Sequence, residues 1–228
     1  MDYSRNQKYF SKMSWKLPIV LIVIGAIIFL VGVSGSAGAA LFGILLIAAG
    51  VAYIVLKTKG TPTDQEYDSA VQKQLDGLKA KALSKLGIDE DEVKEIEPIV
   101  LGGYDYDHFN LCKLGKDNKW RTNRYEAIYL FFSQNEVHCY SYEFCTTEEK
   151  KTESTDVYFY QDIVSASTAS ASAKLTDDKG VQKDYEYESF KLTTAGGTAL
   201  NVSMRDVDEA QRSINAMRQL LRAKKQQG

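Results

Sequence analysis

Apolar and polar positions divide the chain into a long apolar segment, a helical segment and a segment with alternating residues. Residues 17–56 form a run of 40 positions without a charged side chain. A helix crosses the roughly 30 Å hydrocarbon layer in about 20 residues, so this run is long enough for two crossings. Glycines and serines within residues 32–38 predict a turn, because glycine tolerates positive φ and serine bonds local backbone groups. We therefore expect a two-helix transmembrane hairpin.

The two helices of this hairpin are expected at Leu17–Val33 and Ala37–Leu56. A cleaved signal peptide is the competing interpretation, since "GSAGAA" at residues 35–40 resembles a cleavage site of small residues. The second apolar run argues against it, because cleavage there would still leave one membrane helix.

Basic residues flank the apolar run on both sides. Four of them lie within residues 1–16, Lys57 and Lys59 follow the second helix, and the turn carries no charge. The positive-inside rule places such flanks in the cytoplasm. We expect an integral membrane protein with both termini and residues 57–228 in the cytoplasm. Its three cysteines, an odd number, suit a reducing compartment.

Residues 57–94 are expected to form a linker and an amphipathic helix. Thr63 and Glu66 make a capping box at its start. Apolar side chains then recur every three or four residues, at Tyr67, Val71, Leu75, Leu78, Ala82 and Leu86. This stripe fits a helix packed on the following domain, which we favour, or a self-association helix. A seam between helices usually persists for three or four heptads.

From about residue 95 the apolar period changes to two, which is typical of strands. The strand-like runs are Glu95–Leu101, Phe109–Leu114, Lys119–Phe132, Glu136–Thr146, Thr155–Tyr160, Ile163–Ala171, Tyr185–Thr194 and Thr198–Met204. Turn-forming clusters separate many of them: "GKDN", "SQNE", "TDDKG" and "AGG". We expect an antiparallel β domain over residues 95–228.

One predicted strand is apolar on both faces. Ala127, Tyr129 and Phe131 face one way, and the residues between and after them face the other. Such a strand must be covered on both sides, and the helix over residues 63–86 is a candidate for the second cover. A final amphipathic helix carries Val207, Ala210, Ile214, Met217 and Leu221 at alternating spacings of three and four.

Residues 109–225 resemble the pleckstrin-homology-like (PH-like) fold of membrane-anchored bacterial proteins. The resemblance lies in "YEAIYLFFSQNEVHCYSY" as a central hairpin, "YFYQDIVSAST" as a corner between strands, and "FKLTTAGGTALNVSM" leading into a helix. It implies an α+β fold: an N-terminal transmembrane helical hairpin, a linking helix, and an antiparallel PH-like β-barrel capped by a C-terminal helix. It brings no catalytic signature.

Charge is distributed unevenly along the chain. Residues 1–59 carry six basic side chains against Asp2 alone, or +5, while the whole chain has net charge −2. Residues 60–228 therefore carry −7. Nucleic-acid binding needs a surface that neutralises phosphates, so an acidic soluble part argues against nucleic acid as a partner.

Motifs for catalysis or metal binding are weak. "DYDH" (Asp105, Asp107 and His108) puts two carboxylates and an imidazole on one loop, but no nucleophile motif accompanies them. The candidate metal ligands match no zinc spacing: His108, Cys112, His138, Cys139 and Cys145. The glycine pairs in "LGGYDYD" and "TAGGTA" lack a phosphate-loop pattern. We expect a non-enzymatic protein without a metal or cofactor.

A basic cluster is the strongest sequence feature for ligand binding. The stretch "KLGKDNKWRTNR" contains Lys113, Lys116, Lys119, Trp120, Arg121 and Arg124. The first hairpin of eukaryotic PH domains carries basic residues, often as K-x-R, that bind phosphoinositide headgroups. Lys119-Trp120-Arg121 resembles that pattern and implies an anionic headgroup site. The alternative interpretation is a solvated hairpin edge.

The sequence therefore favours a membrane-tethered binding module at the cytoplasmic face, with a protein, a peptide or an anionic lipid headgroup as ligand. The alternative is a ligand-sensing oligomeric membrane effector or channel. Ala39-xxx-Gly43 and Ala48-xxx-Ala52 permit close helix packing, and homo-oligomerisation stays open. Neither apolar helix carries a charge to line a pore.

Overall fold

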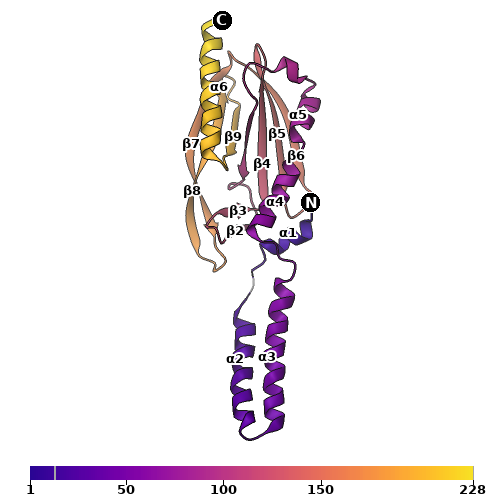
Figure 1. Cartoon of the computed structure of the whole chain (residues 1–228). Helices are drawn as coiled ribbons and strands as arrows, with labels where there is room; N and C mark the ends of the chain where they lie inside the picture. The colour runs from indigo at the N-terminus through magenta and orange to yellow at the C-terminus, as the bar shows by residue number, and fades with distance from the viewer. Residues whose placement is uncertain (13, 228) are drawn as a thin grey trace. The chain divides into compact units, whose positions relative to one another are not determined.

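The computed structural model describes residues 1–12 and 14–227, without the side chains of Glu209 and Gln227, and contains two folded units (Figure 1). The first unit is residues 4–63, which hold most of a short helix, α1 (Tyr3–Tyr9), and an apolar hairpin. The second comprises residues 64 onward together with Met1–Tyr3.

The apolar hairpin consists of α2 (Lys16–Val33) and α3 (Ala37–Thr58). The side chain of Ser36 caps α3 by accepting the Ala39 N–H at 3.5 Å. Both helices are long and apolar enough to span a membrane, and most of their side chains are exposed, unlike those of a soluble core helix. The predicted pair of apolar helices with a turn between them is confirmed.

Glycines form the contact between α2 and α3. Gly25, Gly32, Gly43 and Gly50 are all buried in this contact. A Cβ at Gly43 would lie 2.5 Å from the Phe29 backbone nitrogen, closer than real Cβ atoms approach. Only glycine therefore allows the helices this separation.

Two helices replace the single helix predicted over residues 63–86. These are α4 (Asp64–Leu75) and α5 (Leu78–Leu86). The prediction of one continuous helix is wrong because Gly77 adopts φ 76°, a left-handed conformation that interrupts the helix. A short 3₁₀ turn, η1 (Glu90–Glu92), follows.

The β domain contains two main antiparallel sheets, a small hairpin and a final helix. The first sheet has the order β1-β4-β5-β6, with β1 (Ile99–Tyr104), β4 (Arg124–Phe132), β5 (Glu136–Cys145) and β6 (Lys151–Phe159). The second has the order β7-β8-β9, with β7 (Ile163–Thr176), β8 (Gln182–Thr194) and β9 (Ala199–Ser203). The hairpin pairs β2 (Cys112–Leu114) with β3 (Trp120–Thr122), and α6 (Val207–Gln227) ends the described chain. The mixed α+β class is confirmed, but the described strands form no closed barrel.

The four predicted turn clusters all connect consecutive strands, so these turn predictions are confirmed. Gly180 and Gly197 supply positive φ in two of them. The predicted strand Lys119–Phe132 is interrupted at Asn123, which separates β3 from β4. The buried Asn123 side chain instead accepts the N–H groups of Asn110 and Leu111, at 3.1 and 3.0 Å. This bonding holds the loop that precedes β2.

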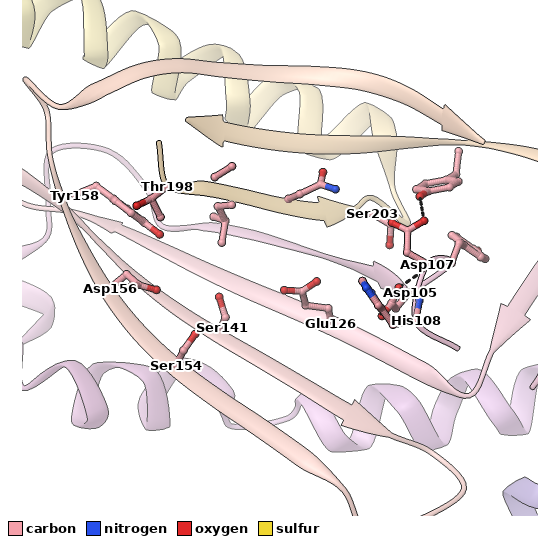
Figure 2. A pocket seen from close by; sticks show the side chains of 15 residues that line it. Asp105, Asp107, His108, Glu126, Ser141, Ser154, Asp156, Tyr158, Thr198 and Ser203 are labelled. Atoms are coloured by element: carbon pink, nitrogen blue, oxygen red, sulfur yellow. Dashed lines mark hydrogen bonds and ion pairs between the residues drawn. The ribbon is translucent and has the colours of Figure 1, made fainter. Parts of the chain in front are cut away.

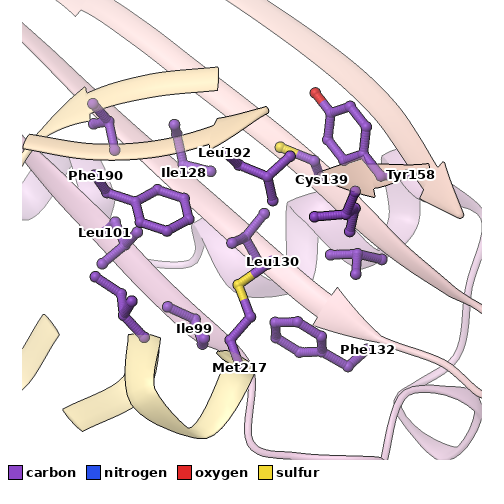
Figure 3. Packing of buried hydrophobic residues seen from close by; sticks show 14 of the residues in the cluster. Ile99, Leu101, Ile128, Leu130, Phe132, Cys139, Tyr158, Phe190, Leu192 and Met217 are labelled. Carbon is purple, nitrogen blue, oxygen red and sulfur yellow. The ribbon is translucent and has the colours of Figure 1, made fainter. Parts of the chain in front are cut away.

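The inner face of the four-stranded sheet forms the main core with β8, β9 and α6. Figure 3 shows part of this core: Ile99, Leu101, Ile128, Leu130, Phe132, Cys139, Tyr158, Phe190, Leu192 and Met217.

The outer face of this sheet is covered by α4 and α5. The Tyr67 hydroxyl donates to the Thr122 carbonyl at 2.8 Å and lies 2.7 Å from the Thr146 hydroxyl. On α5, Leu78 and Ala82 are buried. The prediction that this helical segment packs on the β domain is confirmed.

Candidate functional site

The side chains on the inner face of the four-stranded sheet change from apolar to polar along the strands, on β4 from Leu130 and Ile128 to Glu126. Side chains alternate along a strand, so Glu126 faces the same way as Ile128 and Leu130. Across the sheet, the Ile128 row continues to Ser141 and Ser154, and the Leu130 row continues to Cys139 and Asp156. The polar positions therefore lie beside the core rather than on the solvent face.

These polar positions form the floor of a cleft of about 380 Å³ between β4–β6 and β9 (Figure 2). This volume is within the range of small-molecule sites, about 300–1,000 Å³. The polar residues that line it are Asp105, Tyr106, Asp107, His108, Glu126, Ser141, Ser154, Asp156, Tyr158, Tyr187, Thr198, Asn201 and Ser203.

One end of the cleft closes where β9 meets β1. The Ser203 hydroxyl donates to the Tyr104 carbonyl at 2.6 Å, and the Arg205 N–H donates to the Gly102 carbonyl at 2.9 Å. A Cβ on Gly103 would lie 2.7 Å from the Ser203 backbone carbonyl oxygen, so glycine is needed for this contact. The two sheets are thus joined at this end.

The "DYDH" loop forms a wall of the cleft. Asp105 Oδ1 accepts the N–H groups of Asp107 and His108, at 2.8 and 2.9 Å. His108 Nδ1 lies 3.4 Å from Asp105 Oδ2, and the Tyr187 hydroxyl donates to Asp107 Oδ1 at 3.2 Å. These bonds hold two carboxylates at the rim.

Glu126 has no hydrogen bond or ion pair within the described part of the chain, although it is partly buried. Burial raises the pKa of its carboxyl, and the negative charges of Asp105 and Glu143 raise it further. His108 lowers it, and the resulting pKa is about 7. The ionised carboxylate therefore lacks a counter-ion, and a bound cation would stabilise it.

Positive charge is scarce around Glu126. The nearby Arg124 forms an ion pair with Glu143 on the same sheet face. Among the described residues, no lysine or arginine lines the cleft, whereas four carboxylates do. The cleft is suited to a ligand that brings its own positive charge.

The basic residues predicted from the sequence lie elsewhere and do not act as one surface. Arg121 is 2% exposed, and its guanidinium bonds Asp68 at 2.8 Å and Asp117 at 2.7 Å. The hydrogen bonds from Arg121 hold the pKa of Asp117 below its ordinary value. Burial alone would raise the pKa of Asp68, but the hydrogen bonds from Arg121 and Tyr104 outweigh burial and lower it. Arg121 is therefore a structural link to α4.

The other members of the basic cluster differ in exposure. Trp120 is 5% exposed and packs with Ala173 and Leu175. Lys113 is half-buried, while Lys116 and Lys119 are exposed in the turn between β2 and β3. Headgroup contact by this cluster stays a prediction, and its two exposed lysines are the side chains best placed for it.

The sequence pattern marks the wall of the cleft, the "DYDH" loop, but not its floor. Glu126, Ser141, Ser154 and Asp156 were not recognised because they come from three strands and form no motif along the sequence. The available signal was a polar residue on the inward face, two positions before Ile128 in the case of Glu126.

The described residues contain no group of three or more His, Cys, Asp or Glu side chains arranged to hold a metal ion. Cys139 is in the core, where burial raises the pKa of its thiol to about 12. Comparison with known proteins finds no matching family model, curated protein or solved structure. Function must therefore be argued from the geometry of the cleft.

Proposed function

We propose that this protein is a non-enzymatic, membrane-tethered binding module whose cleft holds a positively charged group of a protein or peptide ligand. The single observation that carries this proposal is a cleft with four carboxylates, no lysine or arginine among its described lining residues, and a partly buried Glu126 without a partner in the described part of the chain. A guanidinium or ammonium group would supply the missing counter-ion and hydrogen-bond donors.

The polar neighbours of Glu126 suit such a ligand. Ser141 and Ser154 present hydroxyls on the floor of the cleft (Figure 2), and Asn201 lines it from β9. Hydrogen bonds between ionised partners are roughly twice as strong as neutral ones, so a cation on Glu126 would dominate recognition. An anionic lipid headgroup would be repelled by the same carboxylates.

The surrounding fold supports the proposed role. A four-stranded and a three-stranded antiparallel sheet followed by one helix fit the PH-like resemblance, in which a rigid β scaffold presents a binding site. The apolar hairpin supplies a membrane anchor, and its basic flanks favour the cytoplasmic side for both termini and the β domain. Tethering raises the local concentration, so a weak ligand suffices.

The test uses the full chain in nanodiscs of zwitterionic lipid, titrated calorimetrically with N-acetyl-arginine amide. The neutral isostere N-acetyl-citrulline amide is the matched ligand control. The variants are Glu126→Gln and, as control, Glu186→Gln at an exposed position on β8. We expect binding of the arginine compound alone, weakened roughly tenfold by Glu126→Gln and unchanged by the control. Equal binding of both compounds, or binding that is insensitive to Glu126→Gln, would overturn the proposal.

A further inference from the structure

The free edge of β9 faces the cleft. The Thr194 N–H donates to the Thr198 carbonyl at 3.0 Å, and the Met204 N–H donates to the Glu188 carbonyl at 2.9 Å. Hydrogen bonding alternates along an antiparallel pair, so even-numbered β9 residues bond to β8. The backbone groups of Ala199 and Asn201 therefore point away from β8.

Those outward backbone groups are available to a ligand. Ala199 and Asn201 are exposed and line the cleft. In the described part of the chain, no hydrogen bond reaches the outward N–H or C=O group of either residue. Unpaired strand edges of this kind recruit an additional strand.

We propose that the cleft takes an extended peptide that pairs with Ala199 and Asn201 of β9 and directs a basic side chain toward Glu126. This inference rests on the proposed function and names its ligand class, a short unfolded segment containing arginine or lysine. Side chains of the added strand alternate between faces. A residue opposite Leu200 would face the same side as Leu200, toward β4–β6, while its two neighbours make the backbone bonds.

The other free edges are less suitable. Next to β6, the Cys145 N–H donates to the Lys150 carbonyl at 2.8 Å. Because hydrogen bonding alternates along an antiparallel pair, the even-numbered residues of β6 form backbone hydrogen bonds with β5. The outward groups of β6 therefore belong to odd-numbered residues such as Thr155, which does not line the cleft. On β7, Arg218 donates to the Ala166 carbonyl at 2.7 Å, so α6 covers the start of that edge.

Charge complementarity selects a basic peptide. An extended segment on β9 would lie above a floor that contains Glu126 and Asp156, with Asp107 at the rim. A neutral peptide would leave the partly buried Glu126 without a counter-ion, and an acidic one would add repulsion. The backbone pairing and the charge contact are separable, so each has its own test.

The probe is a fluorescein-labelled pentapeptide, Thr-Val-Arg-Val-Thr, with both ends blocked, titrated by fluorescence polarisation against the full chain in zwitterionic nanodiscs. The Arg is intended to lie opposite Leu200. A second peptide with Gln in place of Arg tests charge, and a third with both Val nitrogens methylated tests strand pairing on unaltered protein. Ala199→Pro removes an outward N–H, which an edge strand tolerates. Thr155→Pro makes the same change on β6.

We expect the parent peptide to bind, and the Gln peptide, the methylated peptide and Ala199→Pro each to lose at least roughly tenfold in affinity. Thr155→Pro should bind within about twofold of the unaltered protein, and thermal melts should show both proline variants folded. Absent binding of the parent peptide would overturn the inference, as would a loss caused by Thr155→Pro alone. If N-acetyl-arginine amide binds through Glu126 but methylation has no effect, the cationic cleft stands and strand pairing is wrong.

Discussion

Glu126 is partly buried among other acidic groups, and this makes the stability of the β domain depend on pH. Its pKa is about 7 in the folded chain against 4.5 for the ordinary carboxyl. Between these values the folded state binds more protons than the unfolded state. The free energy of unfolding therefore falls as pH rises from about 4.5 through about 7. The charged groups around it are Asp105, Asp107, His108, Arg124, Glu143 and Asp156.

Glu126→Gln should remove this pH-dependent decrease in the free energy of unfolding. The variant is expected to raise the free energy of unfolding at pH 8 by on the order of 1 kcal/mol, and to change it little at pH 4.5. Urea unfolding at both pH values, followed by the fluorescence of buried Trp120, measures the difference. A variant that is less stable than the parent at pH 8 would contradict the description of Glu126 as uncompensated.

Arg121 illustrates the opposite case, a buried charge that is fully paired. Asp68→Ala should destabilise the domain by about 2–3 kcal/mol, because one of the two carboxylates that compensate a 2%-exposed guanidinium is lost. Lys119→Gln, at an exposed position of the same hairpin, should change stability by no more than about 0.5 kcal/mol. Equal effects of the two changes in denaturant titrations would show that Arg121 is not a structural link.

At the level of elements, the attachment of α4 to the sheet depends on a few polar contacts. Tyr67→Phe should cost about 1–2 kcal/mol, because it removes a buried hydroxyl that bonds the Thr122 carbonyl and Thr146. The matched control is Ser69→Ala, at an exposed position two residues further along α4, and it should be nearly neutral. Thermal melts that rank the two variants equally would argue against the packing of α4 described above.

The apolar hairpin depends on close contact between α2 and α3. Gly43→Val should destabilise this contact by roughly 1–3 kcal/mol, because its Cβ would overlap the backbone of Phe29 and the carbonyl of Gly25. Gly38→Ala is the control, since its nearest neighbour would be Ser36 Oγ at 3.9 Å. Cysteine pairs placed across the two helices should cross-link more slowly in Gly43→Val alone. Unchanged cross-linking would contradict the tight glycine contact.

At the scale of the whole molecule, prediction from sequence worked where each residue's role is local or periodic. The hairpin turn at residues 34–36, the four turn clusters and the two-sided cover of the strand containing Tyr129 all follow from such patterns. The breaks at Gly77 and Asn123 were missed because each depends on one residue: Gly77 adopts positive φ, and the Asn123 side chain bonds a distant loop.

The cleft was harder to predict because it depends on contacts between distant strands. Glu126, Ser154 and Asn201 come from three strands, and only the pairing register and the position of β9 bring them together. The basic cluster led the sequence analysis toward lipid because spacing alone does not show that Asp68, some 50 residues earlier, neutralises Arg121. Basic residues that cluster in the sequence are therefore not all exposed in the folded chain, as the buried Arg121 shows.

The most direct test of the account is the pH dependence of N-acetyl-arginine amide binding between pH 5.5 and 8.5. It is measured with and without Glu126→Gln, both in a His108→Asn background so that this imidazole does not contribute. The Glu126 carboxyl has a pKa of about 7 with His108 present, and removing His108 shifts that pKa upward. As counter-ion it predicts affinity that rises roughly tenfold over this range, and a nearly flat profile for Glu126→Gln. A flat profile with Glu126 present, or the same rise in both proteins, would contradict the claim that this cleft binds cationic ligands through Glu126.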